Sequence, residues 1–533
     1  MRSLPSAVTV AIIGAGPVGL MSANLLGRLG IDVLLIERNA APYDIPRAIT
    51  LDDEGARTLQ AVGLDCEYLP LSLPGRGSRY YDDAGKPFAE VGPGPTEFGF
   101  PRRTQIFQPA FERTLLTGLD RFEHVHFSYS HEFLKLKKND EQVRITVAGP
   151  DGQTQDVIAT YVLASDGARS PVRKALGIEM LGDTYPEDWL IVDTLNDPDQ
   201  EPVSKFFCRS DRPYVSIHAP SGGRRYEWRA APGETTESLL DPSRIRALLE
   251  PIRPFKDSDI QRAVVYTFEA RIAERWSDGR VFLMGDAAHL TPPFAGQGMN
   301  AGLRDAHNLC WKIGAVATGK ASSALLDTYE AERRGPAWNM VQLAVAMGDI
   351  VMPRGDLDIA FRTSIVGWMD RFPSARDFIV QMKFKPPPRY DNGAFVALHD
   401  QPFTGSLVGQ MMPQPPMRGV DGAVTRLDDV IGAGFALIAQ QKSTARAMAD
   451  LREILWPELE PTLITIGDSL SSNVDGVTTL VPEASPAMPA LRAHRDQIIL
   501  VRPDRYVAAA FWVEQADKTV SAFRAIMDPM PND

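Results

Sequence analysis

The chain has 533 residues, which is too long for one ordinary hydrophobic core, so two or three domains are expected. Its composition is ordinary for a globular protein, its formal net charge is −12, and no run rich in lysine and arginine is present. These features exclude nucleic acid as an expected partner. No segment is both long and apolar enough to predict a membrane span.

The cysteines and histidines are scattered along the chain. Cys66, Cys208 and Cys310 lie far apart and form no CxxC, which is typical of a cytoplasmic protein without a disulfide framework. The eight histidines form no cluster with the spacing of metal ligands, so no metal is expected.

The start of the chain predicts a strand–helix–strand unit. VTVAII (8–13) is a continuous apolar run typical of a buried parallel strand, and IDVLLIE (31–37) predicts a second one. Between them, residues 20–30 have a helical pattern that stops at Gly30. This order is that of one βαβ unit.

Between the first strand and the helix, Gly14, Gly16 and Gly19 form a GxGxxG pattern. The first glycine permits a tight turn, the second lets a pyrophosphate approach the backbone, and the third allows close packing of helix on strand. Glu37 follows about twenty residues on, where an acid can bind ribose hydroxyls. This acid disfavours a ribose 2′-phosphate and leaves NAD or FAD as the expected ligand.

Later strands carry polar residues at their ends. ATYVLASDG (159–167) predicts a strand that ends in Asp166-Gly167, although this pair by itself could be an ordinary turn. Residues 188–280 contain alternating segments that predict a β-sheet substrate domain inserted into the first domain. GRVFLMGD (279–286) predicts the return of the chain to the first sheet.

The stretch LMGDAAHLTPPFAGQGMN (283–300) favours FAD over NAD. Asp286 ends a strand, where its carboxylate can accept hydrogen bonds from a polyol chain such as ribityl. Gly296 and Gly298 let backbone N–H groups approach a flat ring. A helix expected to begin near Asn300 would point its positive end at the negative charge of a reduced flavin.

The last part of the chain predicts helices followed by a separate small α/β domain. Residues 298–375 look mainly helical, and the proline-rich stretch 384–393 marks a boundary. The expected strands beyond it are 434–440, 463–468 and 498–503, and the expected helices lie near 443–455 and 514–527.

The three motifs, in this order, resemble those of the single-component FAD-dependent aromatic hydroxylases, the group of para-hydroxybenzoate hydroxylase. Further stretches are similar to the branch of 3-(3-hydroxyphenyl)propionate hydroxylase and the related phenol and resorcinol hydroxylases. They include PRAITLDDEG (46–55), QPAFERTL (108–115), residues 212–234 and residues 265–289. The resemblance covers nearly the whole chain.

The resemblance implies an α/β fold with three domains. A Rossmann-like FAD-binding domain with a helical extension would take residues 1–180 and 279–385. A β-sheet substrate domain would take residues 181–278. A thioredoxin-like C-terminal domain without CxxC would take residues 390–533, with a structural or associative role.

The resemblance also implies which residues bind the cofactor. Arg47 has an alternative interpretation as a surface arginine, and Gln108 could equally cap the helix that follows it. The expected cofactor-binding residues are Gly14, Gly16, Gly19, Glu37, Arg38, Arg47, Gln108, Asp166, Asp286, Gly296, Gly298, Met299 and Asn300.

Residues on the substrate side are less well defined by the sequence. The candidate catalytic residues are Pro293, Tyr266 and His218. Pro293 would lie near the reacting centre, whereas Tyr266 and His218 each have an alternative as structural residues. Arg225, Glu227 and Arg229 alternate along one face of an expected strand. They could bind a carboxylate or form a solvated ladder, and we favour the ladder.

By this resemblance the protein is an FAD-dependent monooxygenase in which NADH or NADPH acts as a transient co-substrate. It would hydroxylate a phenolic ring with O2 through a flavin C4a-hydroperoxide, and a homodimer is left open. The alternative within the same chemistry is a tailoring monooxygenase acting on a larger polyketide or antibiotic-like aromatic. A non-catalytic protein on the same fold is disfavoured because all three motifs are retained.

Overall fold

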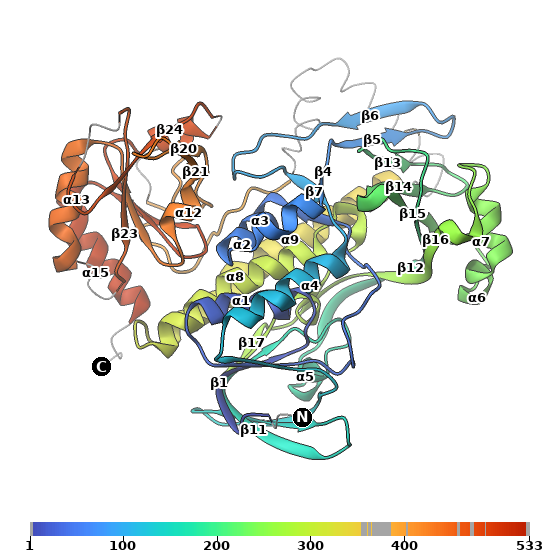
Figure 1. Ribbon diagram of the computed structural model, residues 1–533, viewed down its shortest axis with the longest axis horizontal. Helices are drawn as coiled ribbons and strands as arrows, with labels where there is room; N and C mark the ends of the chain where they lie inside the picture. Colours follow the sequence, from blue (N-terminus) through green and yellow to red (C-terminus); the bar gives the residue numbers. More distant parts are fainter. Residues whose placement is uncertain are drawn as a thin grey trace.

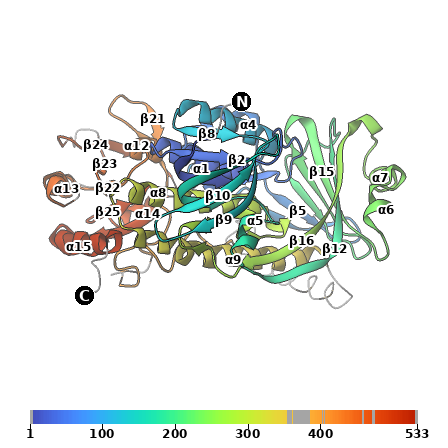
Figure 2. The same cartoon turned by 90° about the horizontal axis from the view of Figure 1, so that it is seen from below.

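The computed structural model describes residues 4–352, 360, 364, 385–400, 403, 405–455, 459–469, 474–485 and 487–528. Figures 1 and 2 show an elongated molecule, with the C-terminal part in orange and red at one end. The first sheet and its helices lie in the middle, and a second sheet lies at the other end. In the described ranges, no helix is long and apolar enough to cross a membrane.

The first sheet contains the strands predicted from the βαβ unit. Its strands are β1 (Ala7–Ile13), β2 (Val33–Ile36), β8 (Val125–Ser128), β9 (Glu132–Lys138), β10 (Val143–Ala148), β11 (Thr154–Ala164), β17 (Ser277–Asp278) and β18 (Val281–Leu283). Their order is β17-β18-β11-β1-β2-β8, and β10 and β9 extend the sheet from β11. Because β1 is parallel to β2 and β11, and β11 to β18, the carboxyl ends of these four strands meet at one edge.

Helices cover the first sheet and fill the middle of the molecule (Figure 1). Helix α1 packs against α8 and α4, and α8 also packs against α2 and α9. The helices before the C-terminal part are α1 (Pro17–Arg28), α2 (Asp53–Ala61), α3 (Asp65–Tyr68), α4 (Gln108–Gly118), α5 (Pro171–Ala175), α6 (Thr236–Leu240), α7 (Pro242–Leu249), α8 (Gly298–Ala317) and α9 (Thr328–Val351). The predicted helical stretch 298–375 is confirmed up to Val351, and most of the remainder lies outside the described residues.

The second sheet has the order β19-β16-β12-β15-β14-β13-β5-β6. Its strands are β5 (Ser78–Tyr81), β6 (Pro87–Val91), β12 (Met180–Thr194), β13 (Ser204–Phe207), β14 (Tyr214–Ala219), β15 (Gly223–Arg229), β16 (Ile260–Ala273) and β19 (His289–Leu290). Strands β5, β6 and β19 come from outside the expected range 181–278, so this sheet is built from several segments of the chain. The predicted domain boundaries remain a prediction.

The two faces of the second sheet have different neighbours. Trp189 and Phe268 lie in one apolar cluster with Phe294 and with residues of α9, and we call this the inner face. Trp228 and Tyr226 lie in another cluster with residues of α6 and α7, and we call this the outer face. A small separate sheet has the order β3-β7-β4. Its strands are β3 (Thr50–Asp52), β7 (Arg103–Gln105) and β4 (Leu73–Pro74).

The C-terminal part forms its own sheet, of order β21-β20-β24-β23-β22-β25-β26. Strands β22, β23 and β24 are parallel, whereas β25 and β26 are antiparallel. The elements are β20 (Pro416–Arg418), β21 (Val424–Arg426), α12 (Leu427–Ile431), β22 (Ala436–Ala439), α13 (Lys442–Leu455), β23 (Thr462–Ile466), β24 (Thr478–Pro482), α14 (Met488–Arg492), β25 (Ile498–Val501), β26 (Val507–Phe511) and α15 (Ala516–Met527). The three strands and two helices expected here are confirmed, so the molecule is α/β as predicted.

Candidate active site

The glycine motif lies where β1 meets α1. Gly14 has a φ of +98°, and a Cβ there would lie 2.6 Å from the carbonyl oxygen of Ser165. At Gly19 a Cβ would lie 2.0 Å from the carbonyl oxygen of Gly14. At Gly16, by contrast, a Cβ would have no atom within 4 Å. Gly14 and Gly19 are therefore required by packing, whereas Gly16 leaves its backbone bare towards open space.

A cavity opens at the carboxyl ends of these strands. It encloses about 1060 Å³ of empty space, part of it open to solvent. The structure brings seven of the expected cofactor-binding residues to its lining: Gly14, Gly16, Glu37, Arg38, Arg47, Gln108 and Asp166. Glu37 is held in place because its carboxylate accepts hydrogen bonds from the backbone N–H groups of Ala15 (3.0 Å) and Asn39 (2.9 Å).

Gln108 holds the loop that carries Arg47. Its Oε1 accepts from the backbone N–H groups of Arg47 (2.9 Å) and Ala48 (2.5 Å), and its Nε2 donates to Glu112 (2.6 Å). Gln108 is the first residue of α4, and no side chain caps that helix by a hydrogen bond. The capping alternative is therefore not what the structure shows. Burial raises the pKa of Glu112 to about 6, while the hydrogen bond from Gln108 acts in the opposite direction.

Two acids offer oxygen atoms to a ligand. Oδ2 of Asp166 accepts from the N–H of Val172 (3.0 Å), whereas Oδ1 is buried and has no partner among the described residues. The side chain of Asp286 is exposed, yet protein surrounds it closely enough for burial to raise its pKa. An accessible carboxylate that protein surrounds lies in a concave part of the surface. Both acids suit the hydroxyl donors of a sugar or ribityl chain.

The glycine loop before α8 also leaves backbone bare. Gly296 has a φ of +63°, and a Cβ at Gly298 would have no atom within 4 Å. Helix α8 begins at Gly298, two residues before the expected Asn300. The N–H of Ala301 donates to the carbonyl of Gln297 (2.8 Å), which is the first hydrogen bond of the helix. The N–H groups of residues 298–300 therefore precede the first helical hydrogen bond and form the positive end of the helix.

Asn300 uses its side chain for structure. Its Oδ1 accepts from the N–H of Asp52 (3.0 Å), and its Nδ2 donates to the carbonyls of Thr50 (3.1 Å) and Gly296 (2.8 Å). Only its backbone N–H is left for a ligand. Met299 is half-buried beside it, and the exposed Pro293 uses its carbonyl to accept from the N–H of Gly296 (2.8 Å).

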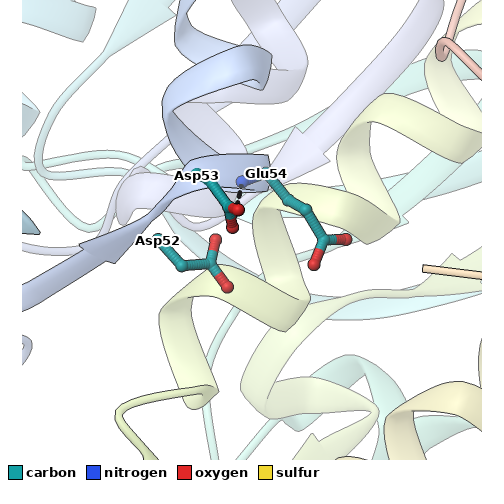
Figure 3. A group of neighbouring side chains, drawn as sticks. All are labelled: Asp52, Asp53 and Glu54. Atoms are coloured by element: carbon teal, nitrogen blue, oxygen red, sulfur yellow. Dashed lines mark hydrogen bonds between the residues drawn. The ribbon is translucent and has the colours of Figure 1, made fainter. Parts of the chain in front are cut away.

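A buried group of acids lies behind this loop and was not anticipated from the sequence. Figure 3 shows Asp52, Asp53 and Glu54, whose carboxylate oxygens lie within 4.8 Å of one another. Arg304 donates to Glu54 (2.7 and 3.0 Å), to Asp52, and to Oε1 of Gln297 in the glycine loop (3.2 Å). Lys385 donates to Asp52 and Glu54, each at 3.1 Å. Two of the three acids, Asp52 and Glu54, are thus hydrogen-bonded to cations, and through Arg304 they fix the glycine loop.

Tyr266 and His218 lie on opposite faces of the second sheet. Tyr266 pairs with Trp189 and therefore shares the inner face, where its hydroxyl accepts from Nη2 of Arg262 (2.9 Å). His218 lies two residues from Ser216, which pairs with Tyr226, so it belongs to the outer face. Its two ring nitrogens are buried and have no partner among the described residues. The structure therefore brings Tyr266, but not His218, to the side of Phe294.

The expectation that Arg225 and Glu227 belong to a solvated ladder is wrong, because both are buried. Arg225 pairs with Asp193 (2.7 and 3.1 Å) and donates to the carbonyls of Pro46 (2.9 Å) and Arg47 (2.6 Å). The alternating charged residues had been interpreted as a face exposed to solvent. On the inner face of this sheet, however, Arg225 is covered by the Arg47 loop, whose carbonyls it binds. Arg225 thus ties the second sheet to the Arg47 loop.

Family comparisons agree with this geometry. The model of an FAD binding domain matches residues 7–344, and the model of the HcaD C-terminal domain matches residues 409–526. The chain is 38% identical over 526 residues to 3-(3-hydroxy-phenyl)propionate/3-hydroxycinnamic acid hydroxylases of Escherichia coli K12 and Shigella sonnei. These matches cover 98% of this chain and 95% of each relative.

Solved structures show the same fold at lower identity. The flavin-dependent monooxygenase PieE, in complex with FAD and substrate, has a TM-score of 0.80 and 20% identity, over 98% of this chain and 100% of its own. Aklavinone-11 hydroxylase with FAD and aklavinone has a TM-score of 0.76 and 24% identity, over 99% and 100%. By its matched domain and its full-length relatives, the chain belongs to the family of FAD-dependent aromatic hydroxylases.

Proposed function

We propose that this protein hydroxylates the ring of a small phenol, with a nicotinamide as reductant and dioxygen as the source of the added oxygen atom. The observation that supports this most directly is the bare backbone at Gly16 and Gly298 together with the recessed carboxylate of Asp286. Such a cradle suits a dinucleotide that ends in a flat ring. The relatives carry the name of a hydroxylase of small phenolic acids.

The residues present fit FAD. In this proposal Gly14, Gly16 and the first turn of α1 hold the pyrophosphate, and Glu37 holds a ribose. Asp286 accepts hydrogen bonds from the ribityl hydroxyls, and the N–H groups of residues 298–300 face the ring. The remaining cofactor contacts are assigned to Arg38, Arg47, Gln108, Asp166 and Gly296, whereas Gly19 serves the close packing of α1 that shapes the site. When bound, FAD supplies electron transfer from the nicotinamide and delivery of one oxygen atom to the aromatic ring.

The chain's own groups bind, orient and exclude water. The first turn of α8 stabilises negative charge on the ring through preorganised N–H groups, and Pro293 forms a rigid wall beside it. Phe294 packs edge-on against Trp189 and Phe268, each with ring centroids 5.5 Å apart, and this cluster keeps water from the inner face. Tyr266, held by Arg262, orients the phenolic hydroxyl. His218 has no part in this arrangement.

Other expectations stay predictions. They are the choice between NADH and NADPH, a cytoplasmic location and a homodimer. A tailoring role on larger aromatics gains no support from relatives that share 38% identity and are named for small phenolic acids.

The test uses the purified, FAD-loaded protein and a panel of phenols that differ in ring substituents. NADH and NADPH oxidation, hydrogen peroxide and hydroxylated product are measured together, with ¹⁸O₂ to trace the added atom. We expect at least one phenol to give about one labelled product per nicotinamide oxidised. Nicotinamide oxidation that yields only peroxide with every phenol, or no stimulation at all, contradicts the proposal.

A further inference from the structure

Arg103 is a half-buried arginine without an acid to pair with among the described residues. In the described part of the chain, its guanidinium forms one hydrogen bond, from Nη1 to Oγ of Ser78 (3.0 Å), and no carboxylate lies within 4.0 Å. Burial lowers its pKa, and the charges of Tyr80 and Asp52 oppose this only in part. The side chain stays partly accessible to solvent.

Neighbouring buried arginines are neutralised. Arg225 has a two-point contact with Asp193, and Arg304 has one with Glu54. A buried charge that lacks such a partner costs several kcal/mol in general, so a protein retains one where an anion binds. Arg103 therefore differs from these structural arginines in having donors left for a negatively charged ligand.

Gln105 provides a second unpaired group on the same strand. It lies two residues from Arg103 in β7, so both side chains project from the same face. Gln105 is 1% exposed, and neither its Nε2 nor its Oε1 has a hydrogen-bond partner among the described residues. A buried amide with no partner is costly unless a ligand supplies one.

The strand places these two side chains between the glycine loop and the aromatic cluster. Gln105 pairs with Thr50, and a Cβ at Gly296 would lie 3.5 Å from Cβ of Thr50. On the other side, Ser78 shares its face of β5 with Tyr80, whose ring stacks on Phe206 with centroids 4.8 Å apart. Tyr80 belongs to the same apolar cluster as Trp189, Phe268 and Phe294.

We propose that Arg103, assisted by Gln105, binds the carboxylate of an aryl carboxylic acid whose phenolic ring lies against the aromatic cluster. This inference rests on the proposed function and names the substrate class more closely. The planar guanidinium offers two parallel N–H donors to a carboxylate, and the amide of Gln105 offers a further one. Arg103 is thus a specificity-determining residue, since a neutral phenol leaves its charge uncompensated.

The experiment compares two probes that differ in the acid group, 3-(3-hydroxyphenyl)propionate and 3-propylphenol. For each, the dissociation constant is measured calorimetrically on the FAD-loaded enzyme, and kcat/KM is measured from product. The variants are Arg103→Gln, Arg103→Lys and Gln105→Leu. The matched control is Arg79→Gln, because Arg79 lies in β5 beside Ser78 and pairs with Glu201 at 3.0 Å, away from the site.

We expect the parent to bind the acid more tightly than 3-propylphenol. Arg103→Gln lowers this affinity ratio by about 100-fold, as for truncation of one partner of a buried charge pair. Arg103→Lys gives an intermediate ratio because it keeps the charge but loses the two-point contact. Gln105→Leu lowers the ratio by about 5-fold, and Arg79→Gln leaves it unchanged.

Two outcomes overturn the inference while the proposed function stands. One is a parent that hydroxylates a phenol without preferring the acid, and the other is a parental affinity ratio in both Arg103→Lys and Gln105→Leu. Gln105→Leu removes no charge, so it decides the matter if the Arg103 variants do not fold. A parent that gives hydroxylated product with neither probe nor any other phenol contradicts the proposed function itself.

Discussion

Single residues of the candidate site act mainly through what they leave uncovered. Gly16 and Gly298 present backbone to open space, and Asp286 presents a carboxylate to a recess. Because the two glycines have no side chain, their backbone N–H groups are free to donate to a ligand. A substitution that adds carbon atoms without charge is therefore the direct test of this arrangement.

We expect Gly298→Val to weaken FAD binding and to uncouple nicotinamide oxidation from product formation. The added side chain fills the space where the ring is proposed to lie, and it blocks the N–H groups of the first turn of α8. Loss of one preorganised donor of this kind costs about 2.7–4 kcal/mol, or about 100- to 1000-fold in rate. FAD content after gel filtration and product formed per nicotinamide oxidised measure the effect.

The matched control is Gly434→Val in the C-terminal part. A Cβ at Gly434 would also have no atom within 4 Å, so the same bulk is added to open space far from the glycine loop. If Gly298→Val retains FAD and couples as well as Gly434→Val does, the loop before α8 is only a turn.

Elements of the site are held together at their ends. The acids at the start of α2 and the first turns of α8 meet through Arg304, which bonds Asp52, Glu54 and Gln297 at once. Asn300 adds bonds from α8 to β3. The bare backbone of the glycine loop is therefore fixed by a polar network behind it, not by its own side chains.

This network predicts a dependence of stability on pH through Asp53. Burial, reinforced by Asp52 and Glu54 and opposed by Lys385, raises the pKa of Asp53 to about 7. A carboxyl with a raised pKa in the folded state stabilises the fold at low pH and loses that contribution as pH rises from about 4 to about 7. Asp53→Asn is neutral in both the folded and the unfolded state, so its stability advantage over the parent should grow as pH rises from about 4 to about 7 and stay constant above that.

Between pH 5 and pH 8 the advantage of the variant in free energy of unfolding should grow by about 2.7 kcal/mol, because about two pH units of this interval lie below the folded pKa of about 7. The free energy of unfolding, measured by denaturant titration at both pH values, checks this. Asp140→Asn, at an exposed acid in a turn, should show no such pH-dependent gain. An equal difference between Asp53→Asn and the parent at pH 5 and pH 8 would mean that Asp53 does not titrate in this range.

The sequence predicted the secondary-structure elements better than it predicted their pairing and the contacts within the site. The apolar runs at 8–13 and 31–37 predicted β1 and β2 because buried parallel strands need continuous hydrophobicity. The pairing of β5 with β13 joins residues far apart in the chain, and no local pattern encodes it. Arg225 was misinterpreted for the same reason, since a buried ion pair and a solvated one share one sequence pattern.

At the scale of the whole molecule, buried ion pairs join the C-terminal part to the cofactor-binding part. Arg57 of α2 bonds Asp428 at 2.5 and 2.7 Å, and Arg502 of the C-terminal part bonds Glu332 of α9 at 2.7 and 2.8 Å. Helix α2 thus carries the loop-fixing acids at its start and the contact with the C-terminal part in its middle. The C-terminal part is integral to the scaffold of the site.

We expect Asp428→Ala to lower the free energy of unfolding by about 3–5 kcal/mol, because it leaves buried arginines without their acid. Arg57 and Arg505 both contact this carboxylate. Thermal unfolding of the FAD-free protein measures the loss, and the FAD content shows whether it reaches the glycine loop. Asp450→Ala, which removes an exposed acid of α13, is the control. Equal stability of the two variants would show that the interface does not depend on this pair.

The pairing of Arg57 with Asp428 also has a consequence for synthesis, because Arg57 is made long before its partner. Arg57 and Asp428 are 371 positions apart in the sequence, and Glu332 and Arg502 are 170 positions apart. Until the last part of the chain leaves the ribosome, α2 and α9 carry charges that their final burial requires to be neutralised. We expect a chain cut short before the C-terminal part to leave these buried charges without partners and to depend on chaperones to stay in solution.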